Sequence, residues 1–213
     1  FDDAGTAKSS HVPNEELDSL KGLPKLAAQY RNRVDATADF AEAFITRHAQ
    51  SPFFFYWAPY APHEPMLEDG DHYLSTVNVR RYSFLTDVEN DARRRGLAMI
   101  KAVDTRVGRL LPQLSRNGLE ERTLVLFASD NGAHHEGGHS HLFFNSTGGL
   151  SGHKRSLYEG GVSTPLIAWW PGRVPADRVS AADVASIDWF ETAAALAGVA
   201  LPPTAAAWVR GVD

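Results

Sequence analysis

Two adjacent residues with oxygen-bearing side chains, Asp130 and Asn131, follow a short apolar run and precede Gly132. The run, Leu-Val-Leu-Phe at residues 124–127, is typical of a buried strand. We therefore expect both side chains at the carboxyl end of that strand, the edge where α/β proteins bind ligands. A carboxylate and an amide offer hard oxygen ligands, which suit Ca²⁺ or Mg²⁺ better than Zn²⁺. Because Asn-Gly is also a common turn pair, a simple turn is the alternative for this motif alone.

Two cationic candidates lie in loops beside other apolar runs. Lys154 belongs to the segment GHKRSLYEGG at residues 152–161, which leads into the apolar run at residues 165–170. His63 follows the aromatic run FFFYW at residues 53–57 and stands in the turn APHEP, which two prolines stiffen. Each residue also has a simpler interpretation when it is considered alone. The lysine would be a surface charge, and the histidine would be part of a rigid turn.

The order of these segments resembles that of the type I sulfatases, which belong to the alkaline-phosphatase superfamily. The matching segments are, in order, PFFFYWAPYAPHEP, SDNG, GHKRSLYEGG, WWPG and SIDWFETAAALAGVALP. The resemblance implies that Asp130 and Asn131 bind a metal ion, with Ca²⁺ expected and Mg²⁺ as the alternative. It also implies that His63 and Lys154 bind the sulfate ester and take part in catalysis.

The resemblance implies a sulfuric ester hydrolase, similar to an arylsulfatase, that cleaves a small-molecule or carbohydrate sulfate ester. An ammonium or imidazolium beside the bridging oxygen would stabilise the negative charge that develops there as the ester breaks. The metal would polarise the other sulfate oxygens. By the same resemblance, the protein would be periplasmic or secreted. Two alternatives stay open: a phosphomonoester or phosphonate hydrolase of the same superfamily, and a noncatalytic relative that binds anionic glycans.

The largest departure from the family pattern concerns the nucleophile. Sulfatases of this kind use a formylglycine made from the Cys or Ser of a C/S-x-P-S-R motif, and this chain contains no cysteine and no such motif. The resemblance covers only the middle of the family's length. We expect residues 1–29 to be a poorly patterned N-terminal segment and residues 30–213 to be a partial catalytic domain. The chain as given is therefore expected to be an inactive fragment.

Helix and strand patterns alternate along the chain. Helical spacing of apolar residues predicts three helices, at residues 36–50, 92–115 and 186–198. Apolar runs predict three strands, at residues 53–57, 123–127 and 167–170. The alternation predicts an α/β fold, a layered α/β/α arrangement with a mostly parallel central sheet. The resemblance implies its alkaline-phosphatase-like version. We expect the strand at residues 53–57 to be covered on both faces, and the arginines of the helix at residues 92–115 to form a solvated basic face.

Composition excludes some classes of partner. The 213 residues are 43% hydrophobic and 22% charged, which is ordinary for a soluble globular protein. The net charge of −5 argues against a nucleic-acid partner, which needs a basic surface. No apolar run approaches the roughly 20 residues of a membrane helix. Because the first residues are polar, we expect no signal peptide among them.

A histidine-rich loop between the two site motifs permits a zinc alternative, because H-x3-H and H-x-H spacings can bring imidazoles together. Its histidines are His134, His135, His139, His141 and His153. No predicted helix holds them on one face, and two Gly-Gly pairs predict a flexible rim. We therefore favour a polar loop that lines a pocket for an anionic substrate, with imidazoles as hydrogen-bond donors.

We predict that the 213-residue chain alone does not hydrolyse an aryl sulfate. Groups that position an ester cannot replace the nucleophile that forms the covalent intermediate. Release of 4-nitrophenol from 4-nitrophenyl sulfate, measured at saturating Ca²⁺, tests this expectation. Metal-dependent hydrolysis by the purified chain would refute it.

Overall fold

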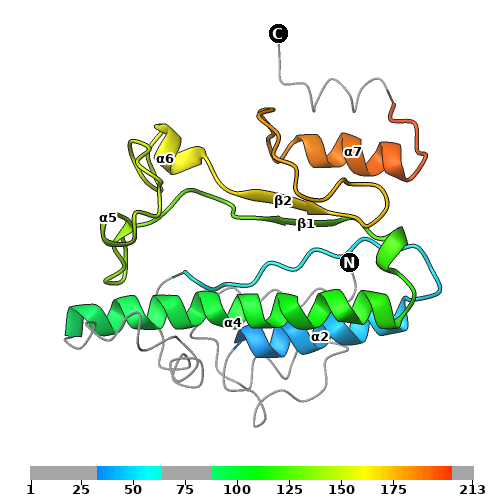
Figure 1. Ribbon diagram of the computed structural model, residues 1–213, viewed down its shortest axis with the longest axis horizontal. Coiled ribbons are helices and arrows are strands. Elements are labelled where there is room, and N and C mark those ends of the chain that lie inside the picture. Colours follow the sequence, from blue (N-terminus) through cyan, green and yellow to red (C-terminus); the bar gives the residue numbers. More distant parts are fainter. Residues whose placement is uncertain (1–32, 64–87, 203–213) are drawn as a thin grey trace. The chain divides into compact units, whose positions relative to one another are not determined.

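A computed structural model of the chain describes residues 33–63 and 88–202 (Figure 1). The chain divides into two compact units, Phe1–Val174 and Pro175–Asp213. The first unit contains α2 (Arg33–Arg47), α4 (Val88–Arg116), the 3-10 helix η2 (Glu120–Arg122), β1 (Val125–Ala128), α5 (His141–Phe144), α6 (Glu159–Val162) and β2 (Leu166–Trp169). The second unit contains α7 (Asp188–Leu196). The domain boundary expected near residue 30 lies outside the described residues and stays a prediction.

Helices α2 and α4 pack against each other through small side chains. Ala41 of α2 and Ala98 of α4 are both fully buried, and alanine lets two helix backbones approach closely. Two apolar clusters form along this contact. The first cluster consists of Val34, Ala98 and Ala102, and the second cluster consists of Ile45, Ala49, Leu114 and Leu119. The two helices that the periodicity predicts in this part of the chain are therefore present.

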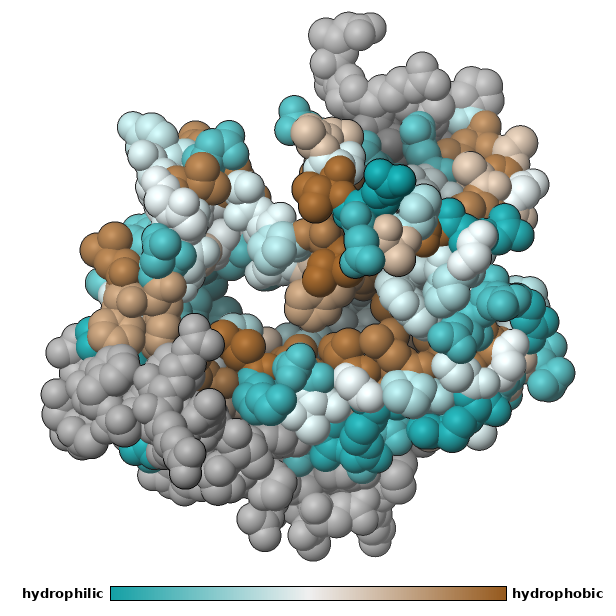
Figure 2. Space-filling model, in the orientation of Figure 1, coloured by the Kyte–Doolittle hydropathy of each residue, from teal (hydrophilic) through white to brown (hydrophobic). Residues whose placement is uncertain are grey.

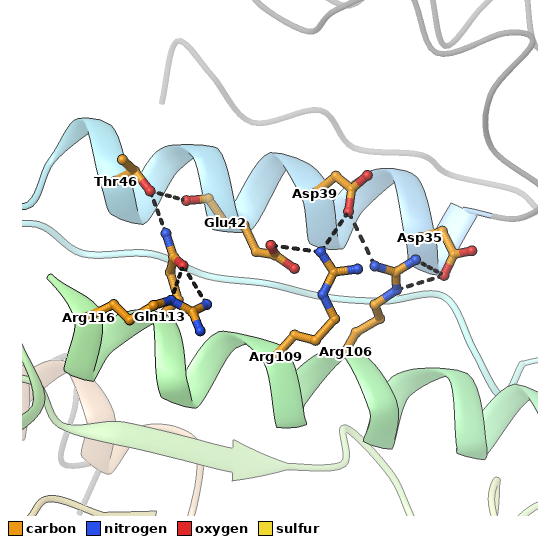
Figure 3. A network of polar contacts seen from close by, with 8 residues as sticks. All are labelled: Asp35, Asp39, Glu42, Thr46, Arg106, Arg109, Gln113 and Arg116. Atoms are coloured by element: carbon orange, nitrogen blue, oxygen red, sulfur yellow. Dashed lines mark hydrogen bonds and ion pairs between the residues drawn. The ribbon is translucent and has the colours of Figure 1, made fainter.

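The arginines of α4 that face α2 are paired with acidic side chains. Arg106 Nη2 lies 2.8 Å from Asp35 Oδ1, and its Nη1 lies 3.3 Å from Asp39 Oδ1 (Figure 3). Arg109 Nη2 lies 2.9 Å from Glu42 Oε2. The side chains of Arg106 and Asp35 are only 11% and 10% exposed. The prediction of a solvated basic face is wrong for Arg106, because acidic residues recur at helical spacing on the side of α2 that it meets.

The aromatic segment after α2, predicted to be a strand, is extended but is not part of the described sheet. Its side chains alternate between two environments, as extended backbone requires. The rings of Phe53 and Phe55 lie 5.9 and 4.8 Å from the ring of Phe44 on α2. Phe54 and Tyr56 are 73% and 76% exposed. Among the described residues, the expectation that both faces are covered is therefore wrong, because the packed side is the one toward the pair of helices α2 and α4.

Strands β1 and β2 pair antiparallel, with Val125 opposite Trp169 and Ala128 opposite Leu166. This pair differs from the mostly parallel arrangement that alternation predicts. The connection at residues 129–165 is longer than the dozen or so residues that a parallel crossover needs, but it carries only the one-turn helices α5 and α6 and no full crossover helix. Antiparallel strands also occur in layered α/β folds. Val125 and Trp169 pack against the second cluster, so the helix pair supports the sheet.

Several large apolar side chains of the two strands stay exposed. Phe127 of β1 is 43% exposed, and Ile167 of β2 is 58% exposed. Brown, hydrophobic atoms reach the surface among teal ones on the side shown in Figure 2. A contiguous apolar surface of this kind is normally covered by another structural layer or by a partner.

We predict that Arg106→Met lowers the free energy of unfolding by about 3 kcal/mol, because it removes the guanidinium from a largely buried carboxylate. The matched change Arg109→Met removes a half-exposed cation and should cost less than about 1 kcal/mol. Urea unfolding followed by circular dichroism measures both values. Equal losses in the two variants would contradict the importance of burial for this ion pair.

Candidate functional site

Asp130 and Asn131 lie just beyond the carboxyl end of β1, which ends at Ala128. Two local hydrogen bonds shape the turn that they form. Ser129 Oγ donates to the backbone oxygen of Asn131 at 3.0 Å, and Asn131 Nδ2 donates to the backbone oxygen of Gly132 at 3.1 Å. Because the amide nitrogen faces Gly132, Asn131 Oδ1 is the side-chain atom left to meet a cation. Asp130 is exposed, so the turn presents two hard oxygen donors in sequence.

Backbone contacts join this turn to the loop that carries Lys154. The N–H of Gly132 donates to the oxygen of Gly161 at 2.9 Å. The N–H of Lys154 donates to the oxygen of Ala133 at 2.7 Å. A Cβ atom on Gly132 would lie 2.1 Å from the oxygen of Gly160, so a side chain cannot be placed there without moving the loop. The Asn-Gly and Glu-Gly-Gly motifs therefore form one structural unit.

The Lys154 side chain lies inside this unit. Its Nζ is 3.6 Å from Oε2 of Glu136, and the side chain is only 19% exposed. The neighbouring Arg155 places Nη2 2.5 Å from Oε1 of the same carboxylate, while its side chain is 74% exposed. Lys154 is therefore not an exposed surface lysine, which was the simpler interpretation of this residue.

Glu136 is not among the site residues predicted from the sequence, although a signal for it exists. It is the one acidic residue between Asp130 and Glu159, in a loop otherwise rich in histidine and glycine. Burial raises the pKa of the Glu136 carboxyl, but Lys154 and then Arg155 hold it below its usual value. The group is therefore a carboxylate at neutral pH, and it balances part of the positive charge of the loop.

His63 follows the cis peptide bond between Ala61 and Pro62. Its N–H donates to the oxygen of Tyr60 at 2.9 Å, and the centroids of the two rings lie 4.9 Å apart. Ala61 packs against the first cluster of the helix pair. These contacts fix the turn on α2 and α4. The convergence of His63 and Lys154 on one site stays a prediction.

The histidine-rich loop, expected from its Gly-Gly pairs to be a flexible rim, is folded against itself in the structure. Its one-turn helix α5 begins after Ser140, whose Oγ accepts a hydrogen bond from the N–H of Phe143 at 3.2 Å. The His139 ring lies 4.5 Å from the His134 ring and 5.0 Å from the Phe144 ring, with near-parallel planes in both pairs. Gly residues with positive φ let the chain turn tightly enough for this packing.

Three further imidazoles of this loop lie in mutual contact. The ring centroids of His141 and His153 are 4.7 Å apart, those of His135 and His141 are 5.5 Å apart, and those of His135 and His153 are 6.0 Å apart. Within residues 33–63 and 88–202, however, no three His, Asp or Glu side chains form a group that could hold a metal ion. The zinc alternative is therefore not supported in this part of the chain.

Two of the loop's histidines are neutral at pH 7. Burial lowers the pKa of His139 to about 4, and nearby positive groups, led by His134, add to the effect. Burial also lowers the pKa of His141. A neutral imidazole offers one donor and one acceptor but no charge. Positive charge beside the Asp130 turn therefore comes from Lys154 and not from these two rings.

Comparisons with known proteins identify the family. The sequence profile described as Sulfatase matches residues 8–199. The N-acetylgalactosamine-6-sulfatase of Canis lupus familiaris is 38% identical over 165 residues, a match that covers 75% of this chain and 28% of that protein. The chain belongs to the sulfatase family. The family suggested by the order of motifs in the sequence is thereby confirmed.

Two other similar proteins extend the comparison. The uncharacterized sulfatase YdeN of Escherichia coli (strain K12) is 30% identical over 206 residues, covering 95% of this chain and 33% of that protein. The crystal structure of Ps i-CgsB in complex with k-i-k-neocarrahexaose superposes with a TM-score of 0.70 at 28% identity, covering 85% of this chain and 39% of that chain. This likeness confirms the alkaline-phosphatase-like α/β fold. The chain thus spans between 28% and 39% of the length of these three proteins.

The structure also bears on membrane insertion. Across the described ranges, none of the helices combines the length and the apolar character that crossing a membrane requires.

We predict that Gly132→Ala lowers the free energy of unfolding by about 1 to 3 kcal/mol, because the added methyl group meets the backbone of Gly160. Gly108→Ala is the matched control, since a Cβ atom at this position of α4 has open space around it. Alanine there should raise the free energy of unfolding by about 0.5 to 1 kcal/mol through its higher helix propensity. Urea unfolding followed by tryptophan fluorescence measures both. A stable Gly132→Ala protein would show that the two motifs are not held by close packing.

Proposed function

We propose that the protein is a sulfuric ester hydrolase that acts on sulfate monoesters, with Asp130 and Asn131 as metal ligands and Lys154 as a substrate-binding catalytic residue. One observation carries this proposal: the backbone hydrogen bonds that join the turn of Asp130 and Asn131 to the Lys154 loop. These bonds support the proposal because they hold the segment with the hard oxygen donors beside the segment that carries the mostly buried lysine. A sulfate monoester needs both, a metal ion at its nonbridging oxygens and a cation at its bridging oxygen.

The donor chemistry of the turn fits Ca²⁺, with Mg²⁺ as the alternative. Asp130 offers an exposed carboxylate, and Asn131 offers Oδ1 while its amide nitrogen is bonded to Gly132. Ca²⁺ takes about six to eight oxygen ligands, so the ester and other parts of the protein would supply the rest. When bound, the ion would polarise the sulfate oxygens and, in the complete family site, the formylglycine.

Lys154 would act on the oxygen that links sulfur to the alcohol. As the S–O bond breaks, negative charge collects on this oxygen, and an ammonium beside it stabilises the departing alkoxide. His63 would assist as a second donor to the ester, which requires that its turn reach the same site. The nucleophile is not among these residues.

The substrate is proposed to be a carbohydrate sulfate. Two names support this choice: an N-acetylgalactosamine-6-sulfatase among the relatives, and a structural neighbour solved with k-i-k-neocarrahexaose. The resemblance to the family also supports a periplasmic or secreted location.

The test uses the protein produced from its complete reading frame, with 4-nitrophenyl sulfate, 4-nitrophenyl phosphate and 6-O-sulfated N-acetylgalactosamine as substrates. We expect release of sulfate that depends on Ca²⁺ and stops with EDTA. Faster release of phosphate would favour the phosphomonoester alternative. Binding of the sulfated sugar without turnover would favour a noncatalytic, glycan-binding protein.

We predict that Lys154→Ala lowers kcat by roughly a hundredfold to a thousandfold, comparable to the loss of an oxyanion-hole donor. The comparison variant Asn131→Asp keeps an oxygen ligand of nearly the same size, so the metal ion still binds. Its added negative charge should instead raise KM for the anionic ester. Steady-state kinetics at saturating Ca²⁺, with metal content measured, separate the two effects. Turnover by Lys154→Ala at the parent rate would remove this lysine from the mechanism.

A further inference from the structure

Glu136 is an anion placed beside the cation that would bind an anionic ester. Its carboxylate contacts two consecutive basic residues, with Oε1 toward Arg155 and Oε2 toward Lys154. The Glu136 side chain is only 15% exposed, so the water around it screens these charges weakly. By charge alone, such a carboxylate would repel a sulfate ester. Its presence in the site therefore needs another reason.

The two ion pairs differ in a way that suggests this reason. Arg155 meets Oε1 at 2.5 Å, which is a short, charge-assisted contact. Lys154 Nζ lies 3.6 Å from Oε2, beyond the usual range of a strong hydrogen bond. The arginine thus makes the shorter contact with the carboxylate, and the ammonium keeps its N–H groups able to reach another acceptor. Lys154 is oriented by Glu136 without being neutralised by a close contact.

The backbone around the two cations supports the same arrangement. Arg155 has a φ of +77°, which is sterically disfavoured for a residue with a side chain. The N–H of Lys154 is fixed on the oxygen of Ala133 at 2.7 Å. A fixed backbone and a disfavoured turn persist only when surrounding contacts stabilise them, and the bond between Arg155 and Glu136 is such a contact.

The histidine-rich loop explains how Glu136 is itself held. The N–H of His139 donates to the backbone oxygen of Glu136 at 2.9 Å, which closes a tight turn. The His139 ring then packs between neighbours, near the rings of His134 and Phe144. Because burial keeps His139 neutral at neutral pH, this packing adds no charge near the carboxylate from that ring. The packed loop thus holds the Glu136 residue, and with it the carboxylate, in place.

We propose that Glu136 is a positioning residue, which holds the Lys154 ammonium in the direction of the ester through an ion pair that Arg155 anchors. This inference rests on the proposed function, because it deepens the role given there to Lys154. It assigns the histidine-rich loop a structural task in catalysis rather than a metal-binding one.

The test compares carboxylate variants in the protein from the complete reading frame. Glu136→Gln keeps size and shape but removes the charge, and we expect kcat to fall by about tenfold to a hundredfold, the scale of a small misplacement of a reacting group. KM should stay unchanged or fall, because one negative charge is removed beside an anionic substrate. Glu136→Asp keeps the charge and should recover most of kcat. Glu121→Gln is the control, since this exposed carboxylate of η2 lies outside the site, and it should leave kcat unchanged.

A second readout does not depend on turnover. Competitive labelling with acetic anhydride reports how strongly each lysine amine is held, and Glu136→Gln should raise the labelling of Lys154 at least threefold relative to Lys101.

An active parent enzyme whose kcat is the same in Glu136→Gln would overturn the inference, and so would unchanged labelling of Lys154. If the parent is inactive but labelling rises, the proposed function fails while the pairing of Glu136 with Lys154 stands. If Glu136→Gln does not fold, Arg155→Met decides, because it removes the exposed cation that anchors the carboxylate, and unchanged labelling and kcat in that variant would overturn the inference.

Discussion

The site depends on one close approach of backbone to backbone, between Gly132 and the pair Gly160 and Gly161. At this point two chain segments are nearer than any side chain would permit, and the N–H of Gly132 is bonded to the oxygen of Gly161 at 2.9 Å. The turn after β1 and the loop that carries Lys154 are therefore neighbours because these glycines have no side chain. A methyl group at Gly132 would separate the two halves of the site before it changed any functional group.

The packed helices α2 and α4 support the chain segments that meet at Gly132, Gly160 and Gly161. Small residues allow α2 and α4 to pack closely, and the ion pair of Arg106 and Asp35 fixes their register. Leu114 of α4 and Leu119, which lies between α4 and η2, pack in the cluster that holds Val125 of β1 and Trp169 of β2. The position of the turn after β1 is therefore set by packing contacts between residues that have no proposed catalytic role. Precision at a site built on loops commonly comes from supporting elements of this kind.

Much of this arrangement follows from local patterns in the sequence. Helical spacing predicts α2, α4 and α7, and apolar runs predict β1 and β2. Elements that bury a face have apolar residues at a regular spacing in the sequence. The order of the motifs predicts the family, and the composition of the turn at Asp130 predicts its donor atoms. The features that the sequence does not predict are contacts between residues that are distant in the chain. The salt bridge of Arg106 requires the acidic face of α2, and the role of Glu136 requires the path of a folded loop.

One prediction fails, and the zinc alternative that the sequence left open finds no support among the described residues, for related physical reasons. Histidine spacing suggests a metal cluster, but spacing does not fix where ring nitrogens point, and the rings of His141 and His153 meet edge to face instead. The aromatic segment after α2 looks like a strand buried on both sides, but a run of aromatic residues does not reveal how many layers cover it. Its exposed residues, Phe54 and Tyr56, show one covering layer among the described elements.

The ion pairs between α2 and α4 have a further consequence for how such proteins diversify. Asp35 and Arg106 are 71 positions apart, yet their contact closes the whole intervening stretch into a loop with fixed ends. The entropy of closing a flexible loop grows only with the logarithm of its length, so doubling the stretch costs about 0.6 kcal/mol. Insertions or deletions between the helices are therefore tolerated while the helix pair, and with it the support of β1, stays intact. The same stretch carries His63, so a change of length fits the proposed site where it leaves the two helices and the His63 turn in place.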